Sequence, residues 1–195
     1  MDDPSSPTLT LAALAVVVGA VQVLLALVGV DPWHFALAWP LADRPWTLVT
    51  SIFAHGSLGH LLSNLLGLVL VGIFLERRTS PGRFYAFFLA AGIVAGVAQV
   101  AVTTLVFGQG TAVLGASGAV FALLGYVLAG NRLTETIAAG SEVSPRVQLT
   151  AVLGVAGILT VATAGAGVAL IAHFTGLSLG LVAGREHLLR PSPSS

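Results

Sequence analysis

The sequence predicts an all-α polytopic membrane protein, a bundle of six transmembrane helices. Of the 195 residues, 56% are hydrophobic and 8% are charged, and the mean hydropathy is +0.97, a composition whose polar surface is too small for a water-soluble domain. Long apolar runs also recur along the chain between short polar stretches. A helix needs about 20 apolar residues to cross roughly 30 Å of hydrocarbon, and six runs approach that length.

The six expected spans are the six apolar runs, taken in order. They lie near residues 9–30, 58–75, 84–106, 113–130, 147–163 and 165–184. The last two are separated by only the short break TAGAG. The acidic start MDDPSSPT has no basic region or cleavage signature, so we expect the first span to remain in the mature protein. The expected organisation is an N-terminal tail (1–8), a six-helix domain (9–186) and a C-terminal tail (187–195).

Arginine placement predicts the orientation of the bundle. With six spans, both tails and the loops 76–83 and 131–146 share one side. This side holds Arg77, Arg78, Arg83, Arg132, Arg146, Arg185 and Arg190. The opposite side holds only Arg44, and positive residues gather on the cytoplasmic side. We therefore expect a multi-pass protein of the cell membrane with both termini cytoplasmic.

The segment 31–57 differs from the spans. It contains all three tryptophans, Trp33, Trp39 and Trp46, and is interrupted by three prolines. Aromatic side chains favour the membrane interface. We expect an external loop that is half embedded in the outer interface, although an ordinary loop with aromatic anchors explains the pattern equally well.

Polar residues inside spans are the candidates for chemistry, because hydrocarbon penalises them. They are His60 and Asn64 in HGSLGHLLSN, Ser117 in GASG, and His173 in AHFTG. His55, five residues before His60, is expected in the loop or first turn that leads into the second span. Counting about 1.5 Å per residue from the cytoplasmic ends of the spans puts Ser117, His173 and His60 within about 6 Å of one another in height. All three are then expected in the outer part of the membrane.

Small residues indicate which spans approach each other. Gly118, Ala122, Gly125 and Ala129 form one stripe, and Ala172, Gly176, Gly180 and Gly184 form another. Such stripes let helix backbones pack closely in lipid. If these two pack together, the Ser117 hydroxyl comes within reach of the His173 imidazole, which can serve as its base. Ser117 is then a candidate nucleophile.

Acyl transfer also requires donors to the oxyanion that forms on the attacked carbonyl. The candidates are the Asn64 amide, the His60 ring N–H and the backbone N–H of Ser117 at a helix start. Gly115 and Gly118 leave room there for a substrate backbone. No Asp or Glu lies near His173 in the outer half of any span, so a Ser–His dyad fits better than a triad.

These motifs resemble the rhomboid family of intramembrane serine proteases. They are H-x4-H-x3-N at 55–64, G-x-S-G at 115–118, A-H-x-x-G at 172–176 and E-R-R at 76–78, in the family's order over about residues 44–184. The resemblance implies a six-helix bundle with Ser117 as nucleophile, His173 as base, an oxyanion site from His60, Asn64 and Ser117, and His55 in support. Its fourth helix is expected to begin inside the membrane, at the floor of a water-filled cavity that opens to the outside.

The resemblance also implies the substrate and the reaction. We expect hydrolysis of peptide bonds in or near transmembrane segments of other membrane proteins, within the lipid bilayer, without a cofactor or metal. Two departures from the family pattern stand out. Thr47 follows Trp46 where many members have arginine, and Phe121 replaces a tyrosine that stacks on the histidine. Phenylalanine keeps that stacking surface and loses the hydroxyl.

Other functions were weighed against this one. A metal site could use His55, His60 and His173, but no HExxH motif or acidic partner is present. A catalytically silent relative typically lacks the serine or the histidine, and a transporter often has repeated halves, which we do not find. Ser117 alone could be bonded to its own helix, and His60 with Asn64 could be structural. The absence of cysteine excludes disulfides, and the zero net charge gives no sign of a nucleic-acid partner.

Overall fold

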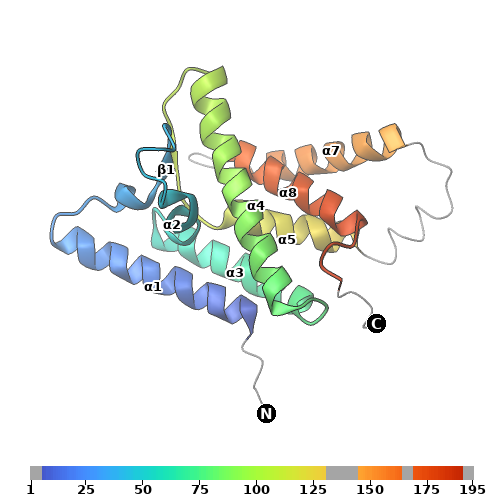
Figure 1. The fold of residues 1–195 in the computed structure, drawn as a ribbon, viewed down its shortest axis with the longest axis horizontal. Coiled ribbons are helices and arrows are strands. Elements are labelled where there is room, and N and C mark those ends of the chain that lie inside the picture. The colour runs from blue at the N-terminus through green and yellow to red at the C-terminus, as the bar shows by residue number, and fades with distance from the viewer. Residues whose placement is uncertain (1–5, 131–144, 164–168, 191–195) are drawn as a thin grey trace, which may run out of the picture.

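The computed structural model describes residues 6–130, 145–163 and 169–190, and in these ranges the chain is mostly helical (Figure 1). The helices are α1 (Pro7–Leu27), α2 (Thr47–Phe53), α3 (Leu58–Glu76), α4 (Pro81–Ala101), α5 (Ser117–Ala129), α7 (Pro145–Ala162) and α8 (Leu170–Arg185). The shorter elements are the 3-10 helix η1 (Pro32–Phe35), the π-helical turn η2 (Val102–Val106), and the strands β1 (Leu37–Ala38) and β2 (Ala112–Val113). The predicted all-helical class is confirmed. Arg132, the ends of both tails and most of the TAGAG break lie outside the described residues.

Among the described residues, three helices are long and apolar enough to cross a membrane. They are Pro7–Leu27, Leu58–Glu76 and the continuous stretch Pro81–Val106. The helices α5 and α8 are also apolar, with 13 and 16 residues, but at about 1.5 Å per residue they are shorter than the hydrocarbon core. The chain is a membrane protein, and the count of six spans stays a prediction.

Capping residues explain where two of the long helices begin. The Ser6 side chain accepts a hydrogen bond from the Leu9 N–H at the start of α1, and Ser57 accepts one from the His60 N–H at the start of α3. These bonds satisfy backbone donors that have no partner inside the helix. At the other end of α3, Glu76 accepts hydrogen bonds from the Ser6 hydroxyl and the Thr8 N–H, at 2.8 and 2.9 Å. This carboxylate joins the start of α1 to the end of α3.

The expected fourth span, near residues 113–130, was wrong at its first residues, because Ala112 and Val113 form β2. The reason is a long-range pairing, because β2 pairs antiparallel with β1, with Leu37 opposite Val113 and Ala38 opposite Ala112. The expectation that the Ser117 N–H lies at a helix start is confirmed, since α5 begins at Ser117. The serine is therefore the first residue of its helix.

The segment 31–57 contains more regular structure than a loop. It holds η1, β1 and α2, while the side chains of Trp33, Trp39 and Trp46 are 51%, 41% and 56% exposed. Exposed tryptophans suit an interface with lipid headgroups. The half-embedded position of the segment stays a prediction.

The two stripes of small residues pack together as predicted. A Cβ added to Gly176 would collide with the carbonyl oxygen of Gly118, and one added to Gly180 would collide with that of Ala122. The same is true of Gly125 against the carbonyl oxygen of Leu177. Glycine, which lacks a Cβ, lets the backbones of α5 and α8 approach this closely. These two helices form the most extensive helix contact among the described elements.

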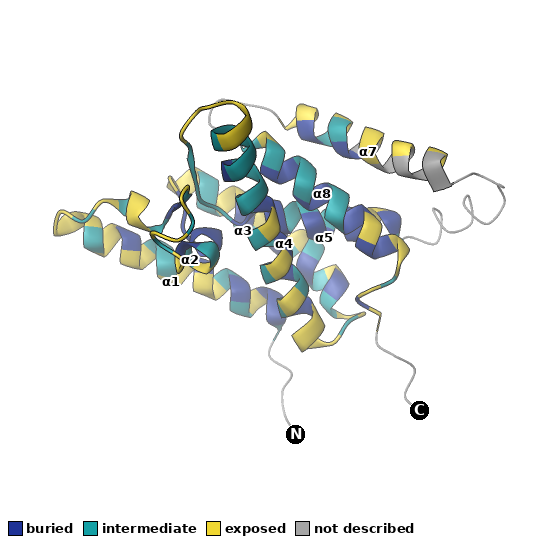
Figure 2. Ribbon diagram, turned by 45° about the horizontal axis from the view of Figure 1, so that its top comes forward, coloured by how far each residue is buried: buried dark blue, intermediate teal, exposed yellow. Residues whose placement is uncertain are grey.

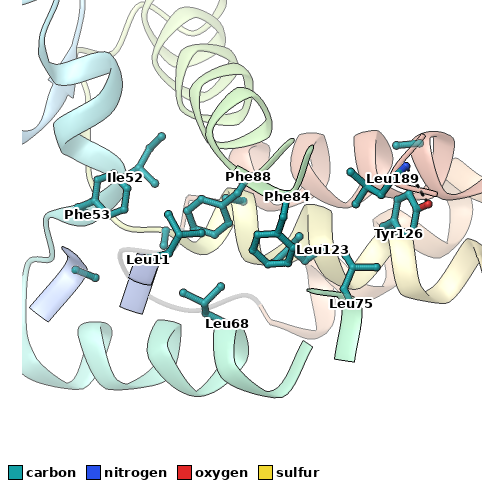
Figure 3. Close-up of a cluster of buried hydrophobic side chains, with 14 residues drawn as sticks. Leu11, Ile52, Phe53, Leu68, Leu75, Phe84, Phe88, Leu123, Tyr126 and Leu189 are labelled. Carbon is teal, nitrogen blue, oxygen red and sulfur yellow. Dashed lines mark hydrogen bonds between the residues drawn. The ribbon is translucent and has the colours of Figure 1, made fainter. Parts of the chain in front are cut away.

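The core lies where α3, α4 and α5 meet (Figure 3). Phe84 and Phe88 from α4 are almost fully buried there, together with Leu68 from α3 and Leu123 from α5. Outside this core, large apolar side chains face outward, and Figure 2 shows exposed residues along α1. On α3 the exposed leucines recur every four residues, at Leu58, Leu62, Leu66 and Leu70. Such a continuous apolar face suits lipid contact.

Candidate active site

A cavity of about 770 Å³ lies between α3, α5 and α8, beside the segment that precedes α5. Its polar lining residues are Ser57, His60, Ser63, Asn64, Ser117, Thr163 and His173. Apolar side chains such as Val71, Val120 and Leu124 complete the wall. Predicted site residues from three separate helices therefore face one cavity.

Ser117 stands at the start of α5, after a backbone that only glycine adopts easily. Gly115 has a φ of +118°, a region that disfavours residues with a Cβ. The first hydrogen bond of the helix runs from the Val120 N–H to the Ala116 carbonyl, at 2.9 Å, so the Ser117 N–H has no acceptor within α5. In the described part of the chain, no hydrogen bond involves the Ser117 hydroxyl. The alternative in which this hydroxyl bonds to its own helix is therefore not what the structure adopts.

His173 is held against Phe121, which lies one turn after Ser117 on α5. The two rings stack with their centroids 4.3 Å apart and their planes at 17°. The stacking surface expected of Phe121 is present. Because residues four apart share a helix face, the stacked imidazole lies on the side of α5 that carries Ser117. The backbones meet there as well, since a Cβ on Gly118 would lie 3.6 Å from the Ala172 carbonyl oxygen.

The hydroxyl of Thr163 lies 3.4 Å from Nδ1 of His173 and donates a hydrogen bond to the Thr160 carbonyl at 2.9 Å. Because the Thr163 hydroxyl already donates its proton to the Thr160 carbonyl, its oxygen can act toward His173 only as an acceptor, from an Nδ1–H. A neutral imidazole with its proton on Nδ1 has a free lone pair on Nε2. This contact was not predicted, because Thr163 stands in the short break before the last span.

His60 and Asn64 line the cavity from α3, one turn apart. The imidazole of His60 packs against the backbone of Gly115, since a Cβ there would lie 2.5 Å from Cε1 and 2.7 Å from Nε2 of the ring. The side chain of Asn64 is buried, and its amide donates a hydrogen bond to the His60 carbonyl at 2.9 Å. An amide group carries two N–H bonds, so one remains for a ligand in the cavity.

The two glycines around Ser117 serve neighbouring protein groups. They were expected to leave room for a substrate, but Gly115 makes room for His60, and a Cβ on Gly118 would lie 2.6 Å from that of Ala95. The N–H of Gly115 also donates to the Ser51 carbonyl at 2.8 Å. The segment before α5 is thus fixed by α2, α3 and β1.

His55 lies behind His60, between α2 and α3, and is buried outside the cavity lining. Their rings meet edge to face with centroids 5.0 Å apart. The His55 N–H donates to the side-chain oxygen of Gln22, and its ring Nδ1 lies 3.0 Å from the Phe53 carbonyl oxygen. Burial, reinforced by the neighbouring His60, lowers the pKa of His55 to about 4. His55 is therefore a neutral support for His60 rather than a lining residue.

Two glutamines were not among the predicted site residues. Gln22 lies in α1 and Gln99 in α4, each inside an apolar run. Gln22 accepts a hydrogen bond from the backbone N–H of His55, and Gln99 accepts one from that of Ala172, which precedes His173. An amide within hydrocarbon signals a polar contact in the bundle. The histidines were singled out as polar residues in apolar runs, and the same criterion would have identified both glutamines.

In the part of the chain that the structure describes, no three His, Asp or Glu side chains gather closely enough to hold a metal ion. Each of the three imidazoles instead contacts a different neighbouring group. His55 contacts the Phe53 carbonyl, His60 packs on Gly115, and His173 stacks on Phe121.

Comparison with known proteins gives consistent matches. The model of the rhomboid domain matches residues 42–188. The chain is 32% identical over 180 residues to the rhomboid protease GlpG of Serratia proteamaculans, covering 89% of this chain and 60% of the relative. It is 33% identical to RHOMBOID-like protein 4 of Arabidopsis thaliana over 76% of this chain and 36% of the relative. Against the rhomboid protease GluP of Bacillus subtilis the identity is 41% over 45% of this chain and 17% of the relative. The chain thus spans at most about three fifths of the length of these relatives.

Proposed function

Because the chain belongs to the rhomboid family, we propose that it is an intramembrane serine endopeptidase that hydrolyses peptide bonds in or near transmembrane segments of other membrane proteins. The observation that carries this proposal is the shared cavity. Ser117, His173, His60 and Asn64 come from three helices and all line it. The names of the relatives GlpG and GluP as rhomboid proteases support the same activity.

In the proposed reaction, the Ser117 hydroxyl attacks the scissile carbonyl while Nε2 of His173 takes its proton. Three contacts support this role for His173. Phe121 stacks on its ring, Thr163 lies at Nδ1, and α8 packs directly on α5. A proton on Nδ1 would leave Nε2 as the base. The resulting imidazolium then gives its proton to the leaving amine, and water hydrolyses the acyl-enzyme by the same route.

The negative charge that forms on the carbonyl oxygen needs donors fixed in advance. We assign the Ser117 N–H, the second N–H of Asn64 and a ring N–H of His60 to this role. Rigidity supports the assignment, because Asn64 is tied to the His60 carbonyl and the His60 ring packs between His55 and Gly115. Such donors need no reorganisation during the reaction.

The substrate must present an unwound backbone at this site, since a fully hydrogen-bonded helix hides its carbonyls. We propose that the cavity opens to the external side and that both termini are cytoplasmic, as the arginine distribution predicts. Helix-destabilising Gly, Pro or Ser near the cut and a small residue at the cut are the expected features of the substrate.

The test is cleavage of a single-span membrane substrate by purified protein in liposomes. We expect cleavage by the wild type, with and without a metal chelator, and none by Ser117→Ala or His173→Ala at equal folded fraction. Full activity in either variant would refute the dyad. Activity that a chelator abolishes would favour a metal site. Binding of the substrate without any cleavage would favour a silent relative.

A further inference from the structure

The side chain of Gln99 caps the helix that carries His173. From the last turns of α4, its Oε1 accepts hydrogen bonds from the backbone N–H groups of Ile171 and Ala172, at 3.0 and 3.2 Å. These two residues directly precede His173. The contact joins residues 72 and 73 positions apart in the sequence.

Within the ranges 6–130, 145–163 and 169–190, no other side chain caps the start of α8. Its N-cap residue is Ala169, which offers no side-chain acceptor. The first N–H groups of a helix need acceptors from outside the helix, and in an apolar bundle an unmade hydrogen bond costs more than in water. Gln99 therefore supplies from α4 what a Ser or Asp would normally supply from the chain itself.

The Gln99 amide is itself held in one orientation. Its Nε2 donates to the Thr103 hydroxyl at 3.0 Å, and that hydroxyl donates to the Gln99 carbonyl at 2.7 Å. With the nitrogen bonded to Thr103, the oxygen points to α8. Thr103 belongs to η2, and π-helical turns often mark functional positions.

His173 is the next residue after Ile171 and Ala172, whose N–H groups Gln99 holds. Its own N–H donates to the Ala169 carbonyl at 3.0 Å, the first bond of the helix after the two N–H groups held by Gln99. Phe121 and Thr163 contact the ring of His173, whereas Gln99 bonds the backbone of the helix turn that carries the ring. We propose that Gln99 is a positioning residue that fixes the first turn of α8 and so holds the His173 imidazole against Ser117. This inference rests on the function proposed above.

The test compares variants of the full chain in liposomes. Gln99→Leu removes the acceptor at similar volume, Gln99→Glu keeps an acceptor oxygen, and Thr103→Val frees the amide to rotate. Val94→Ala is the matched control, because Val94 lies on the same helix with 47% of its side chain exposed. The readouts are kcat and KM for a single-span substrate, amide hydrogen exchange at Ile171 and Ala172, and the NMR signals of the His173 ring.

We expect Gln99→Leu to lower kcat by roughly 10- to 100-fold with little change in KM, because a displacement of about 1 Å can cost 100-fold. Exchange at Ile171 and Ala172 should accelerate at least about tenfold, while the amides of α5 keep their protection. Gln99→Glu should restore most of kcat, Thr103→Val should fall in between, and Val94→Ala should match the wild type.

Three results would overturn the inference. One is wild-type kcat in Gln99→Leu, and another is faster exchange at the cap without any change in the His173 signals. The third is a loss of activity in Gln99→Leu that a smaller fraction of folded protein explains in full. A wild type that cleaves nothing would refute the proposed function. The exchange and NMR readouts would then still decide whether Gln99 fixes His173.

Discussion

Gly180→Ala tests whether the close contact of α5 and α8 maintains the site. In the wild type, Gly180 lies against the backbone of α5, and the new Cβ would collide with the Ala122 carbonyl oxygen. It would also lie 2.8 Å from the carbonyl carbon of Ala122 and 2.9 Å from the Tyr126 nitrogen. These are backbone atoms, so no side-chain rotation can relieve the contact.

The size of the effect follows from this geometry. Carbon atoms pack at about 3.5–4.0 Å, so the two helices must separate by roughly 1 Å at this point. Overpacking of this kind lowers the free energy of unfolding by about 1–3 kcal/mol. A separation of that size, passed on to the Ser117 and His173 end of the helix pair, should lower kcat by roughly 10- to 100-fold.

The assay measures thermal unfolding and cleavage of a single-span substrate in liposomes. Gly154→Ala is the control, because Gly154 lies inside α7 and a Cβ there meets no atom within 4 Å. Alanine favours a helix over glycine by about 1 kcal/mol, so the control should be at least as stable as the wild type and fully active. Equal stability and equal kcat in Gly180→Ala and Gly154→Ala would refute the packing argument.

Other predictions concern single contacts in the site. Asn64→Ala should lower kcat by roughly 10- to 1000-fold, the usual effect of one oxyanion donor, and an unchanged rate in a cleavage assay would remove Asn64 from the site. Thr163→Val should lower kcat by roughly tenfold and broaden the NMR signals of the His173 ring, because the hydroxyl that favours the Nδ1–H tautomer is lost. Sharp, unshifted ring signals in this variant would count against a role of Thr163 in setting the tautomer. Burial lowers the pKa of His55 in the folded state, so between pH 6.5 and about 4 this imidazole binds a proton in the unfolded state but not in the folded one. The unfolding temperature should therefore fall as the pH falls through this range, and it should fall less in His55→Gln. Equal slopes in both proteins would contradict this.

Apolar runs predicted the helices well where local signals set their ends. The run 58–75 matches Leu58–Glu76 closely, because Ser57 caps its start and charged residues follow its end. The run 113–130 failed at its start, because β2 pairs with β1 from a segment about 75 residues earlier. A pairing between such distant segments leaves no periodic pattern near either one.

The site was predicted in the same uneven way. The motifs around His60, Ser117 and His173 pointed to residues that all line one cavity. Thr163 was missed because its importance comes from what it contacts in space, whereas Gln99 was missed although an amide inside an apolar run is a signal in its own right. Thr163 reaches His173 across the break before α8, and Gln99 reaches α8 from α4.

The most direct test of the account is covalent labelling of the serine. A fluorophosphonate reacts with a hydroxyl only when a neighbouring base activates it, and mass spectrometry of the labelled protein locates the adduct. We expect one adduct, on Ser117, in the wild type, and none in His173→Ala at equal folded fraction. An adduct on another residue, or equal labelling of Ser117 without the histidine, would contradict the proposed pair.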